Sequence, residues 1–387
     1  MNRRDFLTGA ATGVVVGAAG TYVATRTATP PVPPAKTVPA PAPAPAMSDT
    51  RHEWKMVTSW PKGLPGLGTG AERLAKRITD LSGGRLTIKV YSGGELVPPL
   101  QCLDAVSSGT AEMSHDASYY HIGKAPAAGF FTAVPFGMTA QELNGWVYYG
   151  GGQELWDELY EPFGIKAFLA GNTGVQLGGW FRKEINSPED LKGLKFRMPG
   201  QGGQVLTKLG ATVVTLPGGE IFANLQSGAI DATEWVGPYN DLALGFYKVA
   251  KFYYWPGFHE PGSALQCMIN KAKWESLTPE LQEIIRSSCA AENDLILAEF
   301  NGRSGAALAT LVNEHGVQLR QFPREILAAF GQASGELMQE LYDTGDAITK
   351  KICASYFKFR KEAAGWTRIS EQAYANARLL EFQYPEG

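Results

Sequence analysis

After residue 50, short stretches of alternating apolar and polar residues take turns with stretches of helical periodicity. Residues 86–90 (LTIKV) alternate as the two faces of a half-buried strand do. Residues 71–81 place apolar side chains every three or four positions, which is the spacing of one helix face. Together with a short apolar run at 55–59, this pattern predicts a strand, a helix and a second strand, the start of an α/β fold.

The same order of elements recurs further along the chain. Strands are predicted at 195–198 and 212–216, with a helix between them. In both parts of the chain another helix follows and stops at a Ser-Gly pair, which ends at Gly109 in the first part and at Gly228 in the second. Glycine is the residue that most often follows a helix C-terminus. The repetition predicts two similar α/β lobes.

From Thr278 onward the apolar spacing becomes helical and keeps that period until Gly316. A short strand is predicted at 317–321.

The following stretch, 326–363, is long and amphipathic, and we expect it to break near Gly335 or Gly345. Two interpretations of its apolar stripe stay open. The stripe packs on the same chain, or it forms the contact between the two copies of a homodimer.

The first residues predict an export signal and a spacer. Residues 3–7 (RRDFL) precede a weakly apolar stretch at 8–24, which resembles a bacterial twin-arginine signal. We assign 1–28 to this signal and 29–50, rich in Pro and Ala, to a semi-rigid linker. The predicted location is the periplasm, and a signal retained as an anchor stays open.

Composition narrows the functional class. The chain has 387 residues, enough for about two domains, with 44% apolar and 19% charged residues. The net charge is −3 and no basic block occurs, so we expect no nucleic-acid partner. The four cysteines show no CxxC or Cys/His spacing, which argues against a structural zinc site. Disulfides stay open because the cysteine count is even.

Catalytic signatures are missing from the sequence. It contains no GxSxG, GxxxxGK[ST] or HExxH motif, and its five histidines are scattered. The glycines of 66–70 lack dinucleotide-binding spacing and instead predict a turn into a helix. We therefore expect no enzyme. An exported oxidoreductase is the alternative from another class, because twin-arginine export often carries proteins loaded with a cofactor.

Four segments dense in Gly, Pro and aromatic residues suggest a small pocket walled by rings, namely 171–182, 193–200, 231–241 and 253–262.

Three charged residues in these segments are candidates for ligand chemistry. Arg197 lies between two apolar neighbours and needs a carboxylate, which either a ligand or a structural Asp or Glu supplies. Glu234 and Glu260 also lie among apolar residues, where a carboxylate needs a cation or a proton. They either bind a metal ion or cap turns.

From about Trp54 to the C-terminus, the chain resembles the solute-binding receptors of tripartite ATP-independent periplasmic (TRAP) transporters, and within them the 2-oxo acid subgroup. The segments that carry the resemblance are WKMVTSWPKGLPGLG, SYYHIGK, VQLGGWFRKEINSPEDLKGLKFRMPG, GGEIFANLQSGAIDATEWVGPYND and YYWPGFHEPG.

The resemblance implies an α/β, two-lobed fold like that of periplasmic binding proteins, with a ligand cleft between the lobes and a long helical C-terminal region. Lobe 1 would comprise 51–175 and be completed by about 260–320, and lobe 2 would comprise 176–259. The C-terminal helical region would comprise 321–387. Membrane permease subunits are the implied partners.

The resemblance also implies roles for seven residues. It makes Arg197 the carboxylate clamp and places a metal ion beside the ligand. The ion would be held by Gln176, Glu234, the main chain of Trp235, and Glu260. Further contacts to the small carboxylate ligand would come from Gln176, Trp235 and either Tyr119 or Tyr120.

Trp235 bears on the ligand class. The commoner dicarboxylate receptors carry an Asn at this position, so the resemblance favours a monocarboxylate bound with an ion. Two carboxylates favour calcium, while the resemblance keeps sodium equally open. Pyruvate or a related α-keto acid is the expected ligand, with lactate or another 2-hydroxy acid and calcium as the alternative.

Overall fold

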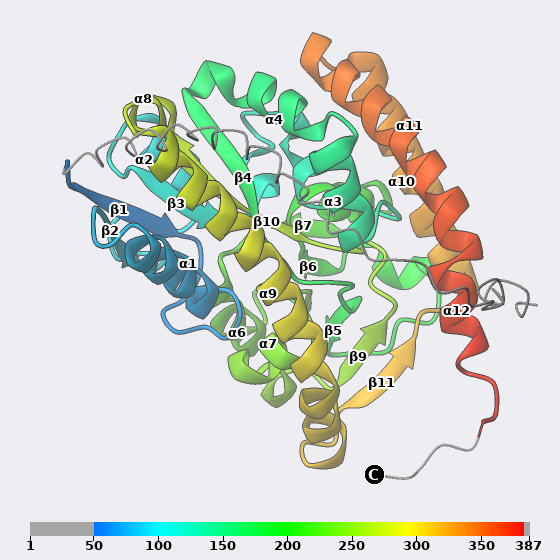
Figure 1. The fold of residues 1–387 in the computed structure, drawn as a ribbon. Coiled ribbons are helices and arrows are strands. Elements are labelled where there is room, and N and C mark those ends of the chain that lie inside the picture. Colours follow the sequence, from blue (N-terminus) through cyan, green and yellow to red (C-terminus); the bar gives the residue numbers. More distant parts are fainter. Residues whose placement is uncertain (1–49, 383–387) are drawn as a thin grey trace, which may run out of the picture. The chain divides into compact units, whose positions relative to one another are not determined.

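The structure is a computed structural model that describes residues 50–382. The predicted signal at 1–28 and all but the last residue of the predicted linker at 29–50 lie outside the described residues. The strands form two sheets, and helices cover both of them (Figure 1). None of the helices among residues 50–382 is both long and apolar enough to cross a membrane.

The first sheet has five strands in the order β2-β1-β3-β10-β4. The pairings of β1 with β2 and β3 are parallel, whereas β10 is antiparallel to both β3 and β4. The bounds of these strands are β1 His52–Thr58, β2 Leu86–Tyr91, β3 Met113–Asp116, β4 Ile165–Asn172 and β10 Ala264–Asn270.

The second sheet has six strands in the order β11-β9-β5-β8-β6-β7. Here β6 pairs in parallel with β7 and β8, while β5 is antiparallel to β8 and β9. The bounds of these strands are β5 Gly179–Phe181, β6 Lys195–Arg197, β7 Thr212–Val214, β8 Ala232–Thr233, β9 Phe252–Trp255 and β11 Gln318–Gln321.

The predicted repeat is confirmed as two matching units. In the first sheet β1 lies between β2 and β3, and in the second β6 lies between β7 and β8, all parallel. Gly109 and Gly228 both adopt positive φ, 76° and 79°, which glycine adopts without steric cost. Each unit also has a carboxylate in an equivalent position. Glu112 accepts a hydrogen bond from the Lys55 amide, and Asp231 accepts one from the Lys195 amide.

Helices and 3₁₀ segments connect the strands. The predicted turn at 66–70 leads into α1, as expected, and its glycines let α1 approach α9 closely. A Cβ on Gly70 would lie 2.6 Å from the Ile296 side chain of α9. The bounds up to α9 are α1 Gly68–Leu81, α2 Cys102–Ser107, η1 Ser118–His121, η2 Pro126–Phe131, α3 Ala140–Tyr149, α4 Gly152–Tyr160, η3 Glu161–Phe163, η4 Pro188–Leu191, α5 Gly200–Lys208, α6 Gly218–Ser227, α7 Pro238–Leu244, η5 Phe246–Lys248, α8 Lys271–Glu275 and α9 Pro279–Asn313.

The C-terminal region is helical, as predicted, in α10 (Arg324–Thr344), α11 (Ala347–Ile369) and α12 (Glu371–Ala377). The break falls at Gly345, and Gly335 lies inside α10.

Much of its apolar stripe packs on the same chain. On α10, Phe330 stacks against Phe258 with ring centroids 3.9 Å apart. On α11, Tyr356 lies against Trp146 at 5.2 Å and accepts a hydrogen bond from the Met138 amide.

All four cysteines lie in the described part of the chain and are buried free thiols, so the disulfide alternative is not realised there.

Candidate functional site

The candidate site lies where the chain crosses from one sheet to the other. Gln176 belongs to the crossing from β4 to β5, and Glu260 belongs to the crossing from β9 to β10. The Gln176 amide donates to the Glu260 carbonyl at 3.1 Å, and the Gly257 amide donates to the Gln176 carbonyl at 3.1 Å. A Cβ on Gly257 would lie 2.4 Å from that carbonyl oxygen, so only glycine permits this approach.

Arg197 and Glu234 are brought together by the pairing of β6 with β8, in which Arg197 lies opposite Thr233. Both side chains are fully buried. Arg197 Nη1 donates to the Glu234 carbonyl at 3.1 Å and to the Glu234 carboxylate, and Nε donates to the Leu216 carbonyl at 3.0 Å. The structural partner considered for Arg197 is therefore Glu234.

The Nη2 group of Arg197 is nevertheless available to donate to a ligand, because it has no hydrogen-bond partner among residues 50–382. Burial works to lower the pKa of this guanidinium, but neighbouring Glu234 raises it, so that the pKa lies above its ordinary value. A charged, buried donor of this kind favours an anion.

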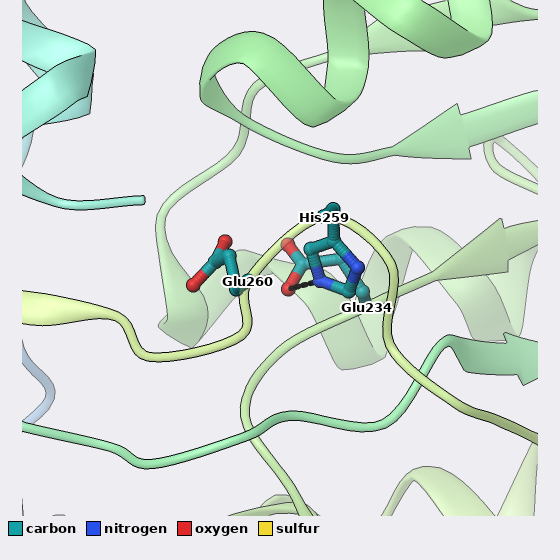
Figure 2. Close-up of side chains that lie close together, drawn as sticks. All are labelled: Glu234, His259 and Glu260. Atoms are coloured by element: carbon teal, nitrogen blue, oxygen red, sulfur yellow. Dashed lines mark hydrogen bonds and ion pairs between the residues drawn. The ribbon is translucent and has the colours of Figure 1, made fainter. Parts of the chain in front are cut away.

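Glu234, His259 and Glu260 form a buried cluster whose ligand atoms lie within 4.8 Å of one another (Figure 2). His259 Nε2 lies 3.3 Å from a Glu234 carboxylate oxygen. Gln176 Nε2 donates to the Glu260 carboxylate at 2.7 Å. In the part of the chain that is described, the buried Gln176 Oε1 has no donor, so it is an oxygen available to a ligand.

The electrostatics of this cluster favour a bound cation. Burial raises the pKa of Glu234 to about 7 even though Arg197 lies beside it. Burial, and after it the charge of Glu234, raises the pKa of Glu260 to about 7. Burial lowers the pKa of His259 to about 4, so its imidazole is neutral. A hard cation would relieve the repulsion between the two carboxylates, and oxygen donors of this type suit sodium or calcium.

Aromatic rings wall a small cavity of about 10 Å³ beside the cluster. Tyr119 and Tyr120 meet edge to face with ring centroids 4.8 Å apart. The Arg197 guanidinium lies 5.1 Å from the Trp235 ring, whose Nε1 donates to the Asn240 side chain at 2.9 Å. A larger groove of about 580 Å³ lies elsewhere, beside α10 and α11. Buried donors and charges, rather than volume, mark the small cavity as the candidate site.

The residues singled out from the sequence are thus gathered in one place, with Gln176, Trp235, Tyr119 and Tyr120 at the cavity and Arg197, Glu234 and Glu260 next to it. Sequence reasoning missed His259 and Trp60. His259 adjoins Glu260 in the FHEPG segment, which was the signal available for it. Trp60 lines the cavity.

Comparison with known proteins gives one family model, bacterial extracellular solute-binding protein, family 7, which matches residues 57–344. A curated relative is the monocarboxylate 2-oxoacid-binding periplasmic protein of Nostoc sp. It is 46% identical, over 84% of this chain and 88% of the relative. Both comparisons identify solute-binding proteins. The prediction that this chain is not an enzyme is therefore confirmed.

Two solved structures are also similar. A TRAP periplasmic solute-binding protein from Pseudoalteromonas atlantica, with bound sodium and pyruvate, is 40% identical with a TM-score of 0.82, covering 86% of this chain and 100% of that chain. A TRAP transporter solute-binding protein from Bordetella bronchiseptica is 41% identical with a TM-score of 0.83, covering 85% and 97%. It is described as a mixed-occupancy dimer with copurified calcium and picolinate. The two-lobed α/β fold expected from the sequence is confirmed by this likeness.

Proposed function

Because the chain belongs to the bacterial extracellular solute-binding proteins of family 7, we propose that it is the periplasmic receptor of a TRAP transporter and binds a small 2-oxo monocarboxylate, such as pyruvate, together with sodium or calcium. The observation that carries the proposal is a buried arginine donor beside a buried cluster of oxygen ligands. An α-keto acid offers a carboxylate to the first and its chelating oxygens to a cation in the second.

Four groups would hold the cation. These are the carboxylates of Glu234 and Glu260, the side-chain oxygen of Gln176 and the main-chain carbonyl of Trp235. The cation supplies positive charge and a place for two ligand oxygens to bind at once. Pyruvate chelates through a keto and a carboxylate oxygen, and picolinate chelates in the same five-membered geometry through its ring nitrogen and a carboxylate oxygen. The ligands of both structural relatives therefore favour cation-assisted binding.

The chain's own side chains would fix the carboxylate. Arg197 keeps Nη1 on Glu234 and offers Nη2 to the acid. Burial raises the pKa of Tyr119 well above its usual range and that of Tyr120 to about 12, so both hydroxyls stay protonated and can donate. With calcium bound, the charges of Arg197 (+1) and the cation (+2) exceed those of Glu234 and Glu260 (−1 each) by one, so the site balances a monocarboxylate better than a dicarboxylate.

Thermal shifts of the purified protein test the proposal. Pyruvate, 2-oxobutyrate, lactate and succinate are compared, each with sodium, calcium or neither. A ligand at about 100 times its dissociation constant adds about 2.7 kcal/mol of stability. We expect a cation-dependent rise with pyruvate and 2-oxobutyrate that exceeds the rise with lactate.

Arg197→Lys should abolish the rise, because lysine keeps the charge but not the fork. Arg182→Lys is the matched control, since Arg182 lies in the same lobe and donates to main-chain carbonyls of Leu225 and Gln226. A rise with succinate alone, or none with any acid, would contradict the proposal. A larger rise with lactate would favour the 2-hydroxy acid alternative.

Delivery and partners follow the same proposal. The twin-arginine signal predicted at 1–28 would export the folded protein, and permease subunits in the membrane would receive its ligand.

We also propose a homodimer formed through the C-terminal helices. The groove beside α10 and α11 is lined by apolar side chains such as Phe136, Met338 and Phe357, and the end of the same helical region exposes Trp366 and Ile369.

A further inference from the structure

Trp60 is the aromatic residue of the cavity that the proposed ligand contacts leave without a role. It follows β1 and is 2% exposed. Its ring lies edge to face with Trp235 at 6.4 Å and tilted against Tyr120 at 6.3 Å. The indole therefore contacts a ring that follows β3 of the first sheet and a ring that follows β8 of the second, and it lines the cavity.

A histidine fixes the orientation of this indole. Trp60 Nε1 donates to His115 Nδ1 at 2.8 Å, and His115 Nε2 lies 3.0 Å from the Ala170 carbonyl. An indole N–H can only donate, so Nδ1 must accept, and the histidine hydrogen lies on Nε2 and is donated to the carbonyl. Burial lowers the pKa of His115, which agrees with the neutral tautomer.

The main chain of Trp60 is fixed as well. Its amide donates to Thr58 Oγ1 at 3.3 Å, and its carbonyl accepts from the Gly93 amide at 2.8 Å. The main chain and the indole N–H are therefore both held, and a rotation of the ring out of the cavity wall would break the hydrogen bond to His115.

Besides Tyr119, Tyr120 and Trp235, the cavity lining contains both polar and apolar residues. Gln176, Thr173 and Ser263 contribute polar atoms. The apolar part is made by Trp60, Leu67, Val236 and Leu265. A 2-oxo acid needs both kinds of lining, because one end of it carries the oxygens and the other carries the alkyl tail.

We infer that Trp60 is the residue that limits the length of the ligand's alkyl tail, and that His115 is a positioning residue that acts through Trp60. The inference rests on the proposed function, since it concerns which 2-oxo acid the same site admits. Trp60 is buried and its indole N–H is held by His115, so a methyl tail can be accommodated at this wall more easily than a propyl tail, which would require the ring to move.

Calorimetric dissociation constants for pyruvate and 2-oxovalerate, with calcium saturating, test the inference. Trp60→Leu should shift the ratio of the two constants toward 2-oxovalerate by about tenfold or more, because each methylene admitted to an apolar pocket is worth about tenfold. Trp54→Leu is the matched control. Trp54 is a buried tryptophan of β1 away from the cavity, so its variant should leave the ratio unchanged.

The histidine has its own pair of variants. His115→Phe keeps a ring but removes the acceptor, and the same ratio should move in the same direction by a smaller factor. His115→Asn places a side-chain oxygen near the position of Nδ1 and should restore the ratio of the unaltered protein. In Trp60→Leu, the further change His115→Phe should add nothing, because its effect passes through the indole.

The outcomes are distinguishable. If the unaltered protein binds no 2-oxo acid, the proposed function fails and this inference fails with it. If the unaltered protein binds pyruvate but Trp60→Leu, folded by circular dichroism, keeps the same ratio, only the tail-length role of Trp60 is overturned. If His115→Phe and His115→Asn move the ratio equally, the positioning role of His115 is overturned.

Discussion

Two buried carboxyl groups, Glu234 and Glu260, control how the site responds to pH. Burial raises both pKa values to about 7, whereas glutamate in an unfolded chain titrates near about 4.3. Between these values the folded state binds more protons than the unfolded state. The stability that each group contributes is therefore fully present below about pH 4 and is lost as the pH rises through about 7.

We predict that the melting temperature of the cation-free protein falls between about pH 5 and about pH 8, and that calcium restores more of it at the higher pH. The reason is that calcium binds the charged carboxylates. Differential scanning calorimetry across this range, with and without calcium, measures both effects. In Glu260→Gln the fall should be smaller and the gain from calcium should nearly vanish. A calcium gain that does not depend on pH would contradict the prediction.

The same residues show what the sequence could and could not predict about the site. Arg197, Glu234 and Glu260 were found because a charge between apolar neighbours needs a partner. Their closeness in space was not predictable from spacing, because it depends on strand pairing and on two crossings between sheets. His259 was hidden because a single histidine looks the same in sequence whether it lies at a site or in a core.

At the scale of elements, the apolar periodicity and the capping residues predicted most of the helices and strands. The predicted helix from Thr278 begins where expected, with the threonine side chain accepting from the Leu281 amide at 3.3 Å. Local patterns did not decide between Gly335 and Gly345 as the break. Both are glycines in amphipathic sequence, and only Gly345 comes where the chain turns from one packed helix to the next.

In the crossing from β9 to β10, the position of Gly257 leaves no room for a side chain, and this can be tested. Gly257→Ala should destabilise the fold by about 2 kcal/mol and weaken calcium binding, because the added Cβ would push the Gln176 carbonyl away. Gly302→Ala is the control. It lies inside α9 with nothing within 4 Å of an added Cβ, and it should stabilise the protein by about 1 kcal/mol. Urea unfolding and calcium titration of both variants check this, and equal effects would refute the argument from close approach.

At the scale of the whole molecule, the lobes are expected to close around the ligand. Segments that follow β1 and β8 are already in contact, through the bond from Asn240 Nδ2 to the Pro65 carbonyl at 2.6 Å and the contact of Trp60 with Trp235. We predict that the radius of gyration in small-angle scattering decreases when pyruvate and calcium are added together. Arg197→Lys under the same conditions should show no decrease. Superimposable profiles for the unaltered protein would rule out closure.

The proposed homodimer would use the groove beside α10 and α11. The apolar groove beside α10 and α11 includes Tyr342, which is 46% exposed. The lining of the groove combines buried side chains of these helices, such as Met338 and Cys353, with the more exposed Phe136 and Tyr342. A second copy can supply a matching apolar surface, because the same region exposes Trp366, Ile369 and Tyr374.

Light scattering after size-exclusion chromatography should therefore give the mass of two chains. Tyr342→Glu should shift the protein toward the monomer, because burying an unpaired carboxylate in an apolar interface is costly. Tyr148→Glu is a close control, with 47% exposure on α3, away from the groove lining. If both variants keep the dimer, the interface lies elsewhere, and if the unaltered protein is a monomer, the homodimer proposal is wrong. Pyruvate binding by the monomeric variant would further show that each site is complete within one chain.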